Sequence, residues 1–280
     1  MPSDLPIGVF DSGVGGLTVM HALADALPDE HLLYLGDTAR VPYGNRGADT
    51  VRRYALNATD FLRGRGIKAL VVACNTATAY ALEALVEHYP EMPIVGVVRP
   101  VADLAIASSV SRHIGVIGTR GTIGSKCYER ALEVPGVRVT ATPCPLFVPL
   151  AEEGWLDGEV TTAVAREYLQ AFAGTDVDTL ILGCTHYPLI ASSIQSVMNE
   201  VVGHDVTLLD SGTATATALK KRLTSSNILR TSQGPRRLEF LATDDPATFA
   251  RTARTFFGGE LDGVEHVDIL DMSDSRRVLK

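Results

Sequence analysis

The sequence LVVACNTA at residues 70–77 has a counterpart of the same design, LILGCTHY, at residues 180–187. Each is an apolar, strand-like run that ends in a small residue and a cysteine, followed by small polar residues and a helix-like stretch. If Cys74 and Cys184 each close a strand in one of two related halves, their thiols face one cleft from opposite sides. Such a pair suits a reaction that removes a proton from one face of a carbon and returns a proton to the other.

On either side of these two segments, strand-like apolar runs alternate with helix-like stretches. This alternation predicts an α/β fold, a parallel sheet with helices on both faces and polar residues gathered at the carboxyl ends of the strands. The expected strands are 7–10, 31–35, 69–73, 94–97, 113–117, 138–141, 179–182, 205–209 and 237–242. The expected helices are one from about residue 17, then 49–64, 76–88, 123–132 and 160–173, one after a turn at residues 211–212, and 246–257.

The composition excludes several classes of protein. The chain has 280 residues, 46% of them hydrophobic and 21% charged, which predicts one large or two moderate domains and argues against disorder. A net charge of −8 argues against nucleic acid as a partner. No apolar run reaches membrane-spanning length and the N-terminus does not resemble a signal peptide, so we expect a cytoplasmic protein without a membrane partner. Of the four cysteines, Cys127 and Cys144 are expected to be small buried hydrophobes, and a disulfide framework is not expected.

A nucleotide site is the first alternative for the glycine-rich turn DSGVGG at residues 11–16. The turn follows a strand and precedes a helix, and Asp37 stands at the end of the next strand, where a ribose contact would fit. However, Thr18 occupies the position of the last glycine in the dinucleotide fingerprint, and no phosphate-loop lysine follows. A tight turn that needs glycine is the simpler interpretation, although it does not explain why a carboxylate, Asp11, comes first.

A zinc site is the second alternative, because Cys74, Cys184, His186 and Asp11 could converge. Only Cys184 and His186 are close in sequence, whereas structural zinc sites usually show paired ligands at short spacing, so this interpretation is disfavoured. The loops at residues 40–44 and 118–122 both follow strands. They are therefore expected at the same cleft mouth, where backbone amides and hydroxyl groups could hold a carboxylate.

At this point the sequence resembles a known family, the glutamate racemases of the aspartate/glutamate racemase superfamily. Together, CNTA and GCTHYP are specific to the superfamily, and the strings IGVFDSGVGGLTV and YLGDTARVPYG favour the glutamate branch. The resemblance runs in order from residue 7 to about residue 210 and is carried by IGVFDSGVGGLTV, YLGDTARVPYG, VVACNTATA, GVIGT and LILGCTHYPLI.

The resemblance implies two α/β domains related by a pseudo-twofold axis, with the active site between them. The first domain would comprise residues 1–98 and 209–280, and the second residues 99–208. It also implies no cofactor: neither pyridoxal phosphate, nor metal, nor nucleotide. The expected partner is a small-molecule substrate, glutamate, whose D-enantiomer would serve peptidoglycan synthesis. A homodimer is considered as the assembly.

The resemblance further implies the roles of individual residues. Cys74 and Cys184 would be the two bases, assisted by Asp11 and His186 respectively, with Cys74 acting on the D-enantiomer and Cys184 on the L-enantiomer. A thiolate suits this work because the pKa of a thiol lies near neutrality and is easily shifted. The substrate would be bound by Asp11, Ser12, Tyr43, Gly44, Asn75, Thr76, Thr119, Thr185 and His186, with Glu152 behind them.

Two other functions stay open. An aspartate racemase or related α-proton transferase would share this fold, and a test of both amino acids by circular dichroism would separate it from a glutamate racemase. A binding protein for a small acidic ligand could keep the fold without turnover. The presence of both cysteines argues against that second alternative.

Overall fold

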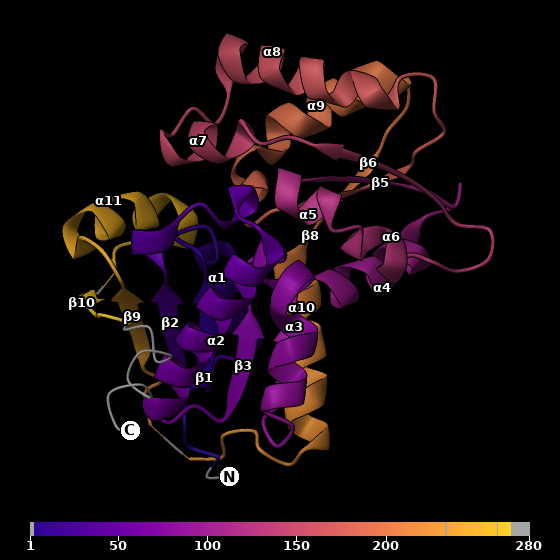
Figure 1. The fold of residues 1–280 in the computed structure, drawn as a ribbon. Coiled ribbons are helices and arrows are strands. Elements are labelled where there is room, and N and C mark those ends of the chain that lie inside the picture. The colour runs from indigo at the N-terminus through magenta and orange to yellow at the C-terminus, as the bar shows by residue number, and fades with distance from the viewer. Residues whose placement is uncertain (1–2, 233, 262, 270–280) are drawn as a thin grey trace.

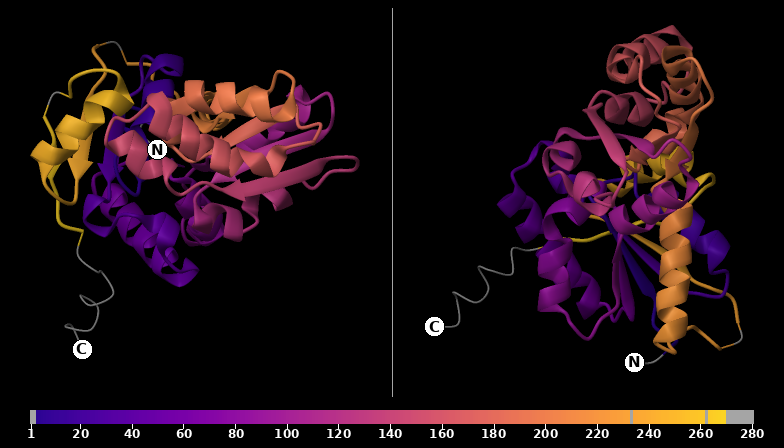
Figure 2. Two further views of the ribbon diagram at one scale, coloured as in Figure 1. Left: turned by 90° about the horizontal axis from the view of Figure 1, so that it is seen from above. Right: turned by 90° about the vertical axis from the view of Figure 1, so that its right-hand side faces the viewer.

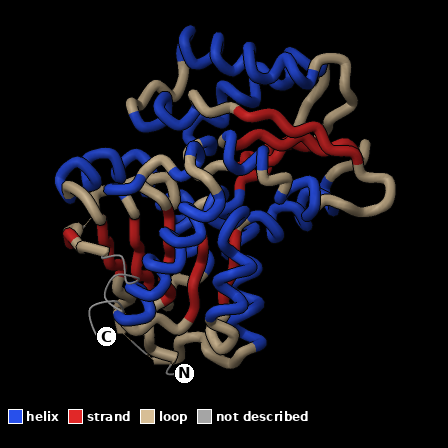
Figure 3. The backbone as a smooth tube through the Cα atoms, viewed as in Figure 1, coloured by secondary structure: helices blue, strands red, loops and turns tan. Residues whose placement is uncertain are grey.

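The computed structural model describes residues 3–232, 234–261 and 263–269. Its strands form two separate parallel sheets, with helices packed on both faces of each (Figures 1 and 3). The smaller sheet and its helices lie above the carboxyl ends of the larger sheet's central strands in the view of Figure 1. The predicted α/β fold class is therefore confirmed.

The larger sheet has six strands in the order β10-β9-β2-β1-β3-β4. Its three central strands are buried along their whole length, as expected for a parallel sheet covered on both faces. The strands are β1 (Ile7–Asp11), β2 (Leu32–Gly36), β3 (Ala69–Val72), β4 (Ile94–Gly96), β9 (Leu238–Ala242) and β10 (Glu265–His266). The helices around this sheet are α1 (Leu17–Ala26), α2 (Ala48–Gly64), α3 (Asn75–His88), α10 (Ser211–Ser225) and α11 (Pro246–Phe257).

The smaller sheet has four strands in the order β6-β5-β7-β8. They are β5 (His113–Gly118), β6 (Arg138–Pro143), β7 (Thr179–Gly183) and β8 (Thr207–Asp210). The helices associated with this sheet are α4 (Val98–Ser108), α5 (Arg120–Gly124), α6 (Cys127–Ala131), α7 (Phe147–Glu152), α8 (Gly158–Leu169) and α9 (Ala191–Val202). Four short 3-10 turns complete the described elements: Thr38–Arg40, Tyr43–Asn45, Gln170–Phe172 and Tyr187–Ile190.

The alternation of side chains along each strand creates two cores per sheet. In β1, Val9 packs with residues of α1, α10 and α11 on one face, and Phe10 packs with residues of α2 and α3 on the other. In β7, Leu182 joins the core beneath α8 and α9, and Ile181 joins the core beneath α4 and α6. Packing on both faces holds each sheet in place, and the loops at the carboxyl ends of the strands extend from these packed sheets.

Two sequence-based expectations were wrong in detail. The single helix expected over residues 123–132 is instead two short helices, because Lys126 takes a left-handed conformation at φ 57° and ends the first of them. The strand expected over residues 94–97 ends at Gly96, and no helix was expected after it. Helix α4 then begins at Val98 with Pro100 in its first turn, where a missing N–H costs nothing.

Helix α10 connects the two halves of the molecule. It follows β8 of the smaller sheet, yet it packs along α1 beside the larger sheet and against α4 (Figure 2). Asp210 caps its start by accepting a hydrogen bond from the Gly212 amide at 2.7 Å. The tail then returns to the larger sheet through β9, which pairs with β2. Residues 270–280 of the expected first domain lie outside the described part of the chain.

None of the helices in the described residues is both long and apolar enough to cross a membrane.

Candidate active site

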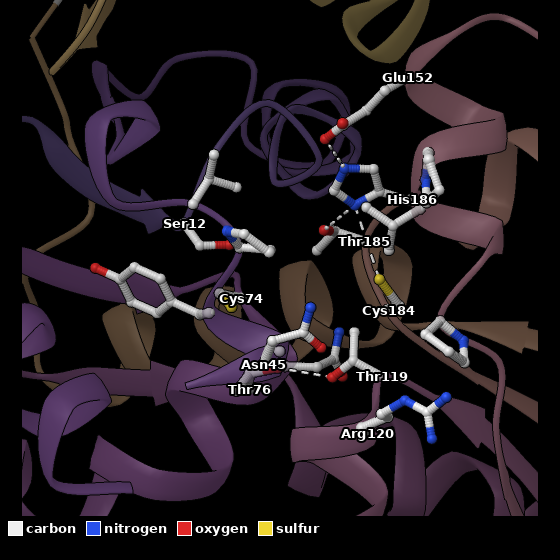
Figure 4. A pocket seen from close by; sticks show the side chains of 18 of the residues that line it. Ser12, Asn45, Cys74, Thr76, Thr119, Arg120, Glu152, Cys184, Thr185 and His186 are labelled. Atoms are coloured by element: carbon white, nitrogen blue, oxygen red, sulfur yellow. Dashed lines mark hydrogen bonds and ion pairs between the residues drawn. The ribbon is translucent and has the colours of Figure 1, made fainter. Parts of the chain in front are cut away.

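A pocket of about 510 Å³ lies between the two halves, at the carboxyl ends of β1, β3, β5 and β7. This is the position at which parallel α/β sheets place their ligands. Both motif cysteines line it, which confirms that the two strand ends meet at one cleft. The complete lining is Ser12, Val41, Pro42, Tyr43, Gly44, Asn45, Cys74, Asn75, Thr76, Thr119, Arg120, Pro145, Leu146, Val148, Pro149, Glu152, Cys184, Thr185 and His186 (Figure 4).

Cys74 caps the N-terminus of α3. Its Sγ accepts a hydrogen bond from the Ala77 amide at 3.4 Å, and its side chain is almost wholly buried. Burial, followed by the nearby Asp11 carboxylate, raises the pKa of Cys74 to about 12. The resting form of this side chain is therefore the thiol, a proton donor. The helix N-terminus beside it favours negative charge and would help the sulfur once that proton has left.

Cys184 belongs to a chain of three functional groups on the other side of the pocket (Figure 4). Its Sγ lies 3.7 Å from Nδ1 of His186, and Nε2 of His186 lies 3.0 Å from Oε1 of Glu152. Burial lowers the pKa of His186, but hydrogen bonds and charge interactions with Cys184 and Glu152 outweigh it and raise that pKa to about 10. His186 is therefore a cation at neutral pH, in contact with a sulfur.

Asp11 is buried, its charge helps to raise the pKa of Cys74, and it is not among the residues that line the pocket. Its Oδ2 accepts a hydrogen bond from the Gly13 amide at 2.9 Å, whereas Oδ1 is buried without a partner among the described residues. Burial raises the pKa of this carboxyl group. Asp11 is thus placed to act on Cys74, and its expected contact with the substrate stays a prediction.

Hydroxyl groups and a buried carboxylate organise the pocket floor. The Thr76 hydroxyl lies 3.0 Å from the Thr119 hydroxyl and 3.1 Å from that of Thr122, which joins the start of α3 to the start of α5. The loop that carries Tyr43 is held by Asp37, whose carboxylate accepts hydrogen bonds from the Tyr43 hydroxyl and from Nε of Arg40. Asp37 is therefore fully engaged in holding this loop, not exposed for a ribose.

The β1–α1 turn makes direct contact with the second half of the molecule. The Thr18 hydroxyl donates a hydrogen bond to the Thr185 carbonyl at 3.1 Å. A Cβ atom added to Gly15 would overlap the side chains of Thr185 and His186. The glycine is thus required for this close approach, which explains part of the DSGVGG turn without any nucleotide.

Most residues expected at the site reach the pocket. Among the expected residues, only Asp11 does not line the pocket. Those that line it are both cysteines, Ser12, Tyr43, Gly44, Asn75, Thr76, Thr119, Glu152, Thr185 and His186. Val41, Pro42 and Arg120 also line it, and they belong to the two loops expected at the cleft mouth. Sequence reasoning missed one polar residue and an apolar rim: Asn45, Pro145, Leu146, Val148 and Pro149. Asn45 adjoins a quoted motif and could have been found from it, whereas residues 145–149 carry no chemical pattern.

The other two cysteines are buried, as expected, and all four lie in the described part of the chain as free thiols. Within residues 3–232, 234–261 and 263–269, no group of three or more His, Cys, Asp and Glu side chains is arranged to hold a metal ion.

Comparison with known proteins decides the family. The model of the Asp/Glu/hydantoin racemase family matches residues 7–219. The chain belongs to this family. A glutamate racemase from Geobacter metallireducens is 48% identical to this racemase over 94% of this chain and 96% of the relative. The resemblance stated from the sequence motifs is therefore confirmed, and the protein is an isomerase of the racemase class.

Solved racemase structures share the whole architecture. The glutamate racemase from Francisella tularensis, solved in complex with D-glutamate, superimposes with a TM-score of 0.89 at 35% identity, covering 95% of this chain and 98% of that one. The glutamate racemase from Thermus thermophilus, solved with β-chloro-D-alanine, gives a TM-score of 0.87 at 43% identity, covering 97% of this chain and all of that one.

Proposed function

We propose that this racemase interconverts L-glutamate and D-glutamate without a cofactor, with Cys184 and Cys74 as the two bases. The observation that carries the proposal is the presence of both thiols in one pocket, each beside a different ionisable partner. The names of the similar racemases support glutamate as the substrate.

The protonation states of the resting site set the direction of the first step. In this scheme Cys184 acts as the base toward L-glutamate, because the cationic His186 beside it stabilises negative charge on the sulfur. Burial raises the pKa of Cys74 and keeps that residue as a thiol. With L-glutamate, the Cys184 thiolate removes the α-proton, and the electron pair of the C–H bond stays on the carbon. The Cys74 thiol then gives its proton to the opposite face. D-Glutamate leaves, and the enzyme now holds a Cys184 thiol and a Cys74 thiolate.

The reverse reaction, or proton exchange with water, restores the resting form. Asp11 is the orienting and relay partner of Cys74 in this scheme, and His186 serves Cys184. Glu152 acts through His186, because its carboxylate contacts the ring nitrogen that faces away from the sulfur.

The intermediate with a carbanion-like α-carbon needs fixed donors for its carboxylate. Asn75, Thr76 and Thr185 supply neutral donors, and the N-terminus of α3 adds backbone amides. Preorganised neutral donors stabilise charge that develops in the transition state without reorganising at the moment of reaction. Ser12, Tyr43, Gly44 and Thr119 complete the proposed substrate shell around the ammonium group and the second carboxylate.

Several broader features of the proposal follow from the family resemblance. The D-glutamate would supply peptidoglycan synthesis, and thereby cell shape, in the cytoplasm. The two domains would divide at residues 98/99 and 208/209 around a pseudo-twofold axis, and a homodimer is the assembly considered.

The proposed substrate is tested by following optical rotation or circular dichroism of L- and D-glutamate, and separately of both aspartate enantiomers, with chelator-treated enzyme and no added cofactor. We expect the optical rotation or circular dichroism of either glutamate enantiomer to fall toward zero, and that of both aspartate enantiomers to stay unchanged. Folded enzyme that leaves both glutamate enantiomers unchanged, or that racemises aspartate instead, would contradict the proposal.

A further inference from the structure

Tyr128 is a buried phenol in α6 that contacts both thiol-bearing strand ends. Its hydroxyl donates a hydrogen bond to Oδ1 of Asn75 at 2.7 Å, and Asn75 directly follows Cys74. Its ring packs against Gly183, where an added Cβ would lie 2.9 Å from Cε2 of the phenol. Gly183 directly precedes Cys184. One side chain outside the pocket lining therefore joins the neighbours of both proposed bases.

The hydrogen bond to Tyr128 fixes which end of the Asn75 amide faces the tyrosine. Asn75 lines the pocket and is only 3% exposed. Because Oδ1 accepts from Tyr128, Nδ2 and its two N–H groups point the other way. Nδ2 is buried and has no hydrogen-bond partner among the residues that the structure describes. A buried amide donor left unpaired is destabilising, so its natural partner is an acceptor brought by a ligand.

The surroundings of the phenol favour its role as a donor. Burial raises the pKa of the Tyr128 hydroxyl, so the group keeps its proton throughout the neutral range. Gly183 has no Cβ, and an added one would also lie 2.7 Å from the Ile117 carbonyl oxygen, so the ring and the strand end fit closely. The position of the hydroxyl is thus tied to the strand β7, which ends at Gly183, directly before Cys184.

We propose that Tyr128 is a positioning residue that holds the Asn75 amide with Nδ2 facing the substrate, so that this donor binds a carboxylate of glutamate. The proposal rests on the proposed function, which supplies the ligand. In this proposal Tyr128 acts only through Asn75. A side chain of α6, beside the smaller sheet, thereby sets the orientation of the amide donor that follows Cys74.

Tyr128→Phe removes the hydroxyl and keeps the ring against Gly183. The amide can then rotate, and kcat/KM for glutamate racemisation should fall about tenfold, mainly through a higher KM. Tyr89→Phe is the matched control, because Tyr89 is a buried tyrosine that follows the far end of α3, and its hydroxyl also donates a hydrogen bond of 2.7 Å, to Asp60 of α2. The control should lower the melting temperature similarly while leaving kcat/KM within twofold of wild type.

A double-mutant cycle with Asn75→Ala separates positioning from general support of the fold. If Tyr128 acts through Asn75, Tyr128→Phe should change kcat/KM by less than twofold once the amide is gone. A loss of similar size in both backgrounds would overturn the proposal. If Asn75→Ala lowers turnover below detection, the dissociation constant of D-glutamate is measured by calorimetry for wild type, both single variants and the double variant, and these four values are compared in the same way.

Asn75→Asp tests the direction of the amide independently. It keeps an acceptor for Tyr128 and replaces Nδ2 by an oxygen, which would repel a carboxylate, so it should weaken glutamate binding more than Asn75→Ala does. Equal or tighter binding would overturn the proposal. Wild-type enzyme that binds glutamate without racemising it would contradict the proposed function instead. In that case the double-mutant cycle of glutamate dissociation constants would still test the role of Tyr128.

Discussion

Nε2 of His186 lies 3.0 Å from Oε1 of Glu152, although the two residues are 34 positions apart in the chain. The other ring nitrogen of His186 faces the sulfur of Cys184. Glu152 therefore contacts the imidazole on the side opposite the sulfur. In the proposed mechanism, the cationic ring stabilises the negative charge that Cys184 carries when it acts as the base.

The protonation state of His186 can be measured directly. Its pKa is raised from 6.5 to about 10, so the ring should carry protons on both nitrogens at pH 8. Glu152→Gln removes a carboxylate that favours the cation, so the titration of His186 should move to lower pH. Nitrogen-15 NMR of labelled histidine, assigned with His186→Gln, reports both. A neutral His186 ring in wild-type enzyme at pH 8 would refute the proposed resting state.

Replacement of either thiol by serine should lower racemisation by about 10²–10⁴-fold, because a hydroxyl is a far poorer base than a thiolate. Both Cys74→Ser and Cys184→Ser should still bind glutamate in calorimetry, since the neutral donors are untouched. With a glutamate analogue that loses a leaving group after one deprotonation, Cys74→Ser should process the L-form and Cys184→Ser the D-form. Near-normal racemisation by both variants would rule out the two-thiol mechanism.

The separation of the sulfurs is a geometric prediction for the complex. Two thiols that flank one α-carbon should lie roughly 7–8 Å apart, given near-attack distances of about 3–3.5 Å on each side. A crystal structure with bound D-glutamate measures this distance. Sulfurs on the same side of the α-carbon, or one sulfur out of reach of it, would be incompatible with proton transfer at both faces.

The contact between the β1–α1 turn and His186 predicts a sharp difference between neighbouring glycines. Gly15→Ala places a Cβ against Thr185 and His186, so the halves must shift, and activity should fall about 100-fold. Gly13→Ala is the matched control, because its Cβ would lie 3.5 Å from Cγ2 of Val41, an ordinary contact. The control should keep most of its activity. Equal activity of the two variants would show that the contact is not required for turnover.

The strands and the two cysteine motifs were predictable from the sequence because their signals are local. A buried parallel strand is an apolar run, and a thiol after such a run falls at the carboxyl edge of a sheet. The break at Lys126 was not predictable, since no glycine marks the left-handed residue. Helix α4 was not expected, although Pro100 stands in its first turn, where proline is tolerated.

The remaining parts of the site depend on tertiary contacts. The apolar rim at residues 145–149 has no pattern of chemical groups, and it reaches the pocket only because α7 packs beside His186 and its neighbours. The bond between Tyr128 and Asn75 joins residues 53 positions apart and has no counterpart in any local motif. Sequence patterns therefore indicated the two proposed bases and their partners Asp11 and His186, but not the contact between Tyr128 and Asn75.

Exchange of the α-proton in heavy water tests the two-thiol racemisation of glutamate most directly. Chelator-treated enzyme without added cofactor is incubated with L-glutamate in heavy water, and both enantiomers are analysed early in the reaction by NMR and chiral separation. The D-glutamate formed should carry deuterium at the α-carbon, while the remaining L-glutamate keeps its proton, because a different thiol serves each face. D-Glutamate that retains the original proton, or folded enzyme that causes neither exchange nor racemisation, would contradict this account.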